Sequence, residues 1–103
     1  MCKSTSTGSA VPDVLIENER ARVTHWCFPK REDNTGWHLH EHDYLVVPLY
    51  DGVLDIRDAN GNISRSELRV GVPYFGKQGV EHDVSSPNDF EFAFIEVEFF
   101  VEA

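Results

Sequence analysis

The sequence has few basic residues. Nine lysines and arginines stand against 18 aspartates and glutamates in 103 residues, and the formal net charge is −9. Proteins that bind polyanions present clustered Lys and Arg side chains, which neutralise phosphates and release counterions. The composition therefore argues against nucleic acid or an anionic membrane surface as a partner.

Cysteines and long apolar runs are also scarce. The two cysteines, Cys2 and Cys27, lie far apart in the sequence, so no disulfide framework is expected and a reducing cytoplasm suits the chain. The first nine residues have no apolar core long enough for a signal peptide, and no segment approaches the roughly 18 residues of a membrane-spanning helix. We therefore expect a soluble, cytoplasmic protein.

No segment shows a sustained 3.6-residue apolar period, which argues against a helical fold. Instead, eight or nine short segments rich in β-branched and aromatic residues alternate with Gly, Pro and Asn. The segments span 11–17, 22–28, 37–40, 45–50, 53–57, 63–70, 71–76, 80–85 and 90–101. This pattern predicts a single antiparallel β-barrel or sandwich over residues 11–103, with one modest core. Residues 1–10, rich in Ser, Thr and Gly, are expected to form a flexible tail.

Two of these segments predict further detail. Asn60–Gly61 is typical of a two-residue type I′ turn, because both residues tolerate positive φ, and it should join 53–57 to 63–70 in a hairpin. In the last segment, alternation places Phe92, Phe94 and Glu96 on one face of the strand.

Several of the expected strands are apolar on both faces. The interior of one barrel covers only one face of each strand. A partner subunit is the simplest cover for the other face, so we expect a homodimer.

The main functional signal is the pair His38 and His40. If residues 37–40 are extended, both side chains project from the same face, close enough to bind one ion. Transition metals usually take three or more protein ligands, and His82 is the best candidate for the third. The third histidine matters because a His-x-His pair alone is more often two surface or hydrogen-bonded histidines than a ligand pair. His25 is expected to be structural or exposed.

The spacing around these histidines resembles the two motifs of the cupin family, whose members are small jelly-roll β-barrels. Residues 37–44, 74–83 and 90–96 are similar to the short cupins known as β-alanine degradation proteins. The resemblance implies an antiparallel jelly-roll barrel that binds one divalent transition metal, such as Fe, Ni, Mn or Zn. The matching residues are His38, His40 and Gly52 for the first motif, and Gly71, Gly79 and His82 for the second.

The chain departs from the cupin motifs at four positions. The most important is that of the family's glutamate ligand, where this chain has Tyr44 or Leu45. If the strand phase holds, Tyr44 points the same way as the histidine pair, whereas a bulge at 41–43 would place Leu45 there; we favour Tyr44. His42 is the alternative fourth ligand, or else an exposed loop histidine. The other departures are Glu32, Lys77 and Ser86, in place of glycine, proline and asparagine.

Two functions follow from these residues. The first is a metal-dependent enzyme of the non-haem iron oxygenase type, acting on a small carboxylate or amine metabolite. Three neutral histidines leave the charge of the ion uncompensated, which favours an anionic ligand, and Tyr44 would donate a hydrogen bond or a proton to it. The alternative is a non-catalytic module that holds or senses a small molecule through its metal. Lys77 and Gln78 either line the mouth of the barrel or are turn residues.

Overall fold

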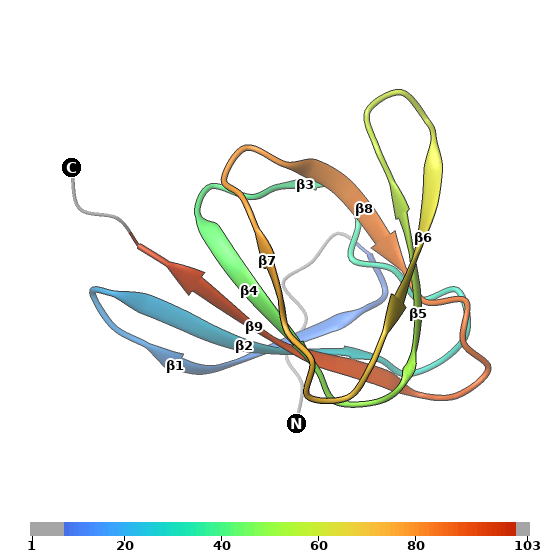
Figure 1. Cartoon of the computed structure of the whole chain (residues 1–103), viewed down its shortest axis with the longest axis horizontal. Coiled ribbons are helices and arrows are strands. Elements are labelled where there is room, and N and C mark those ends of the chain that lie inside the picture. Colours follow the sequence, from blue (N-terminus) through green and yellow to red (C-terminus); the bar gives the residue numbers. More distant parts are fainter. Residues whose placement is uncertain (1–7, 101–103) are drawn as a thin grey trace.

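Every regular element among the residues that the computed structural model describes, 8–100, is a β-strand (Figure 1). This confirms the all-β prediction. The strands are β1 Val11–Glu17, β2 Ala21–Phe28, β3 His38–Leu39, β4 Asp43–Pro48, β5 Gly52–Arg57, β6 Ile63–Leu68, β7 Tyr74–Gly76, β8 Glu81–Ser85 and β9 Phe92–Phe99.

The strands form two antiparallel sheets, which enclose the core as a jelly-roll barrel (Figure 1). One sheet has the order β1-β2-β9-β4-β7 and the other the order β3-β8-β5-β6. Strand β9 lies between β2 and β4 and pairs with both, although both strands come much earlier in the sequence. The closing strand is shorter than the predicted segment 90–101.

The core lies between the two sheets. Strands β2 and β9 contribute Phe28, Phe92 and Phe94, and the rings of Phe28 and Phe94 are 5.8 Å apart between centroids. Val46 of β4 and Leu54 of β5 pack with them, both 1% exposed. Burial of each such side chain contributes about 1.5–3 kcal/mol relative to leaving it in water. Phe92 and Phe94, which the sequence pattern placed on one face of the last strand, therefore both face the core.

The hairpin between β5 and β6 forms as predicted, but its turn is of another kind. The backbone N–H of Asp58 donates to the carbonyl of Asn62 at 3.0 Å, and that of Gly61 donates to the carbonyl of Asp58 at 3.1 Å. The loop thus has three residues, with positive φ at Gly61 but not at Asn60. The Asp58 carboxylate accepts from the N–H groups of Asn60 and Asn62, which favours the longer loop. The two-residue type I′ turn is therefore a wrong prediction.

Residues just before β1 are packed. Ala10 is fully buried, and its N–H donates to the carbonyl of Asn34 at 2.7 Å. The Ser9 hydroxyl accepts from the N–H of Asn34 at 3.1 Å. Ordered contacts therefore begin inside the segment expected to be a tail, whose first seven residues lie outside the described part of the chain.

Two other sequence expectations concern cysteines and membranes. Cys27 is buried in β2, and Cys2 lies outside the described residues. Residues 8–100 contain no helix long and apolar enough to cross a membrane.

Candidate metal centre

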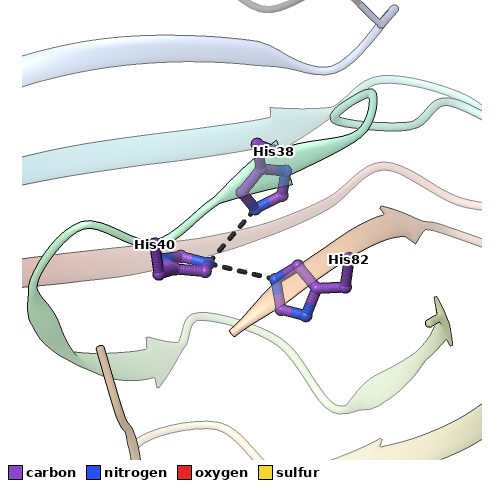
Figure 2. A group of neighbouring side chains, drawn as sticks. All are labelled: His38, His40 and His82. Carbon is purple, nitrogen blue, oxygen red and sulfur yellow. Dashed lines mark hydrogen bonds between the residues drawn. The ribbon is translucent and has the colours of Figure 1, made fainter. Parts of the chain in front are cut away.

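Three histidines converge inside the barrel (Figure 2). His38 in β3 and His82 in β8 are direct cross-strand partners, and His40 follows β3 on the same face as His38. The pairing continues past β3, because the N–H of His40 donates to the carbonyl of Val80 and the N–H of Gly79 donates to the carbonyl of His40, both at 2.8 Å. The β3–β8 ladder therefore positions all three rings.

The ring nitrogens lie at distances that suit one ion. The Nε2 atom of His40 is 3.1 Å from Nε2 of His38 and 3.0 Å from Nε2 of His82. Two imidazole nitrogens bound at about 2.1 Å to one ion lie about 3.0 Å apart at a right angle and about 3.4 Å apart at the tetrahedral angle. All three potential ligand atoms lie within 4.8 Å of one another, so the structure brings together the three histidines that the spacing predicted.

The tautomer of His38 also suits metal binding. Its Nδ1 atom is 2.8 Å from the carbonyl oxygen of Gly36, which can only accept, so the hydrogen-bond pattern assigns the proton to Nδ1. In the neutral ring, Nε2 then presents its lone pair to the other two histidines. A single proton on His40 Nε2 can be donated along only one of its two contacts, whereas a cation interacts with all three lone pairs. The donor set therefore fits a metal ion.

The electrostatics keep two of the histidines neutral. Burial, reinforced by the neighbouring His38 and His82, lowers the pKa of His40 to about 3. Burial and His38 likewise lower the pKa of His82 to about 4, although Asp83 acts in the opposite direction. Both rings are less than a tenth exposed. Neutral imidazole is the form that ligates metals, so neither ring needs to lose a proton at neutral pH.

A buried carboxylate on β8 holds the loop that leads to His38. Asp83 follows His82 and points to the opposite face of the strand, as alternation requires. Its carboxylate accepts from Asn34 Nδ2 and from the N–H of Gly36, all at 3.1 Å, and from Arg57 at 3.2 Å. Sequence reasoning did not single out Asp83. Its partners lie up to 49 residues away, and no local pattern reveals them.

Tyr44, not Leu45, faces the histidines. The Tyr44 side chain is 5% exposed, and its ring stacks on that of His40 with centroids 3.8 Å apart and an interplanar angle of 14°. Its cross-strand partner on β7 is Gly76, where a Cβ atom would overlap the tyrosine ring. Burial, and then Glu96, raise the pKa of Tyr44, so the phenol is neutral at physiological pH. Its catalytic role stays a prediction.

The other residues considered from sequence lie outside the group of three histidines. The ring of His42 contacts that of Phe100 edge-on at 4.7 Å. His25 is half-buried in β2, opposite Ile95 of β9. Lys77 and Gln78 are exposed in the turn between β7 and β8, where the N–H of Gln78 donates to Asp43 at 2.8 Å. They are turn residues.

Glu96 of β9 borders the histidines, a role that the sequence analysis did not assign to it. It is 8% exposed, and Trp26 Nε1 donates to its carboxylate at 3.3 Å. Burial, and then the charge of Glu98, raise its pKa to about 7, against the effects of Trp26 and Arg22. The signal for it was present in the sequence, because alternation put a charged residue on the face of two core phenylalanines.

Two cavities meet at the histidines. The inner one, of about 20 Å³, is bordered by all three histidines together with Tyr44, Tyr74 and Glu96. The outer one, of about 370 Å³, shares His38, His40 and Glu96 with it and extends to Trp37 and to the Arg22–Glu98 pair. Small molecules of metabolite size fit the outer cavity.

Known proteins resemble this chain in both sequence and fold. No family model matches the sequence. The chain is 43% identical over 89 residues to the β-alanine degradation protein BauB of Pseudomonas aeruginosa, a match that covers 86% of this chain and 92% of BauB. The crystal structure of a cupin domain from Bordetella pertussis Tohama I has a TM-score of 0.85 and 43% identity, and the match covers 97% of this chain and 100% of that one.

A more distant structure agrees on the fold alone. A Klebsiella pneumoniae protein with a double-stranded β-helix domain has a TM-score of 0.70 at 21% identity, covering 91% of this chain and 79% of that one. The antiparallel barrel is thus a cupin fold, with three convergent histidines inside it. The chain belongs to the family of small cupins that includes BauB.

Proposed function

We propose that this cupin binds one divalent transition metal through His38, His40 and His82 and acts with it as a metal-dependent enzyme on a small metabolite. The observation that carries the proposal is the convergence of the three Nε2 atoms, with two contacts of 3.0–3.1 Å among two buried rings and one half-buried ring. The name of BauB refers to β-alanine degradation, which supports a carboxylate or amine metabolite.

The residues of the chain support distinct parts of this function. The three histidines would hold the ion as neutral ligands, and a bound divalent ion would supply Lewis acidity or, for iron(II), a centre for oxygen chemistry. Because no carboxylate belongs to the group of three in the described residues, the ion would keep its full positive charge and attract an anionic group. The neutral phenol of Tyr44, stacked on His40, would donate a hydrogen bond or a proton there.

The experiment is elemental analysis of protein purified without a histidine tag, followed by oxygen-uptake assays with iron(II) and candidate metabolites. The wild-type chain should hold about one transition metal, and His40→Ala should lose it because the remaining pair is a weak site. His42→Ala is the matched control, since that ring lies outside the group and its loss should leave metal content unchanged. Full metal content in His40→Ala would refute the site. Metal and ligand binding without turnover would identify a binding or sensing module instead.

A further inference from the structure

We propose that Glu96 binds the ammonium group of a ligand whose other end reaches the metal, so that the site takes small amine-bearing carboxylates. The metal end of this inference rests on the proposed function. The evidence that Glu96 binds an ammonium group comes from the surroundings of Glu96 and does not depend on the metal.

The Glu96 carboxylate has unused hydrogen-bonding capacity. Trp26 Nε1, at 3.3 Å, is its one hydrogen-bond partner among the described residues. A carboxylate accepts about four hydrogen bonds, and a buried one is costly unless its charge is paired. Glu98, two residues along the same strand, shows the contrast, because it receives two bonds from Arg22 at 2.8 and 3.0 Å. The more deeply buried carboxylate is thus the one to which no cation is hydrogen-bonded.

The wall of the outer cavity has no other charge for Glu96 to pair with. Apart from the histidines His38 and His40, Arg22 is the one basic residue among those that line the cavity. Its guanidinium already forms the bidentate pair with Glu98 and lies 5.5 Å from the ring centre of Phe100. When Glu96 is ionised and no ion is bound, the net charge of this wall is therefore the single negative charge of Glu96, and a cationic group is its complement.

The position of Glu96 suits one end of a short ligand. It lines both cavities with His38 and His40, yet it is not a member of the group whose ligand atoms cluster within 4.8 Å. It stands beside the ion site and does not complete it. A molecule that reaches both the ion and Glu96 needs a metal-binding group, such as a carboxylate, at one end and an ammonium group at the other. Trp26 and Trp37, which also line the outer cavity, add aromatic surface that favours cations.

Two probes that differ only in this group test the inference by calorimetry on zinc-loaded protein at pH 8. β-Alanine and butanoate have the same number of heavy atoms, with an ammonium in the first where the second has a methyl. Glu96→Gln keeps the side-chain shape and an acceptor for Trp26 but removes the charge. Glu81→Gln is the matched control, because it removes an exposed carboxylate that likewise accepts from a tryptophan of the outer cavity, Trp37, at 3.1 Å.

Wild-type protein should bind β-alanine more tightly than butanoate. Glu96→Gln should weaken β-alanine binding at least about tenfold and change butanoate binding less than about threefold, as expected for loss of one charge-assisted contact. Glu81→Gln should leave the preference for β-alanine in place. The inference is overturned by an unchanged β-alanine affinity in Glu96→Gln, by equal losses for both probes, or by the same loss in Glu81→Gln.

Metal content, measured for every variant, separates this result from a failure of the proposed function. If wild-type protein takes up no metal, the same two probes are compared on the metal-free protein. There, a preference for β-alanine that disappears in Glu96→Gln still supports the ammonium site, and the absence of any preference refutes it.

Discussion

Acidification should destabilise the metal-free protein, and Glu96→Gln should make that effect larger. His40 and His82 bind their protons more weakly in the folded chain, at pKa values of about 3 and about 4, than at their ordinary 6.5. The unfolded chain therefore takes up more protons below pH 6.5, and stability falls as the pH drops. Glu96 has the opposite effect on stability, because its pKa of about 7 in the folded chain lies above the ordinary 4.5. Its contribution therefore stabilises the folded state as the pH falls from about 7 to 4.5.

The magnitudes follow from about 1.4 kcal/mol per pKa unit. At pH 4.5, two units below 6.5, each histidine reduces the free energy of unfolding by about 2.7 kcal/mol, or about 5 kcal/mol for both. Glu96 offsets about 3 kcal/mol of this loss over the same range. Wild-type protein should therefore lose about 2 kcal/mol between pH 7.5 and 4.5, and Glu96→Gln about 5 kcal/mol.

Urea unfolding in the presence of a chelator, repeated at four pH values across this range, measures how the stabilities of wild type and Glu96→Gln change with pH. The slopes with urea should be alike for the two proteins, so that midpoints compare directly. Parallel pH profiles for wild type and Glu96→Gln would refute the assignment of a raised pKa to Glu96. A wild-type stability that rises on acidification would refute the picture of two buried neutral histidines.

Three further predictions concern packing, the loop before the site, and assembly. Gly76→Ala should reduce the free energy of unfolding by about 1–3 kcal/mol, because its Cβ would overlap the Tyr44 ring, and the added change Tyr44→Leu should recover part of the loss in urea unfolding. Asp83→Ala should reduce the free energy of unfolding by about 2–3 kcal/mol. It should also weaken zinc binding in a chelator competition, because Asp83 holds the N–H of Gly36, whose carbonyl orients the His38 ring; unchanged zinc affinity would contradict this. Light scattering at micromolar concentration should give the mass of a dimer, since β1 exposes three consecutive apolar side chains, and a monomeric mass would contradict it.

Local patterns in the sequence were enough for the strands and for the histidines. Alternation along the chain depends only on neighbouring residues, so it placed His38 with His40 and Tyr44 on the inner face. The third histidine came from its spacing within the cupin motifs, and the structure sets it directly opposite His38. These features are local or are encoded by a family spacing.

The features that the sequence could not supply depend on contacts between distant segments. The role of Asp83 requires residues 34–36 to lie against β8, and the turn at Asp58 depends on a side chain competing for backbone N–H groups. Glu96 was visible as an inward-facing charge, but only the packing of β9 between β2 and β4 shows that it borders the histidines. Which surface would contact a second subunit depends equally on packing between distant segments.

The back-to-back placement of His82 and Asp83 on β8 has a consequence for strand register. A slip of β8 by one residue would turn every side chain to the other face, bringing the carboxylate into the barrel and the imidazole out of it. The same slip would release the loop that Asp83 holds before His38. A misregistered chain would therefore lose two of the three ligand positions at once, and metal binding would select the correctly paired barrel over its one-residue neighbours.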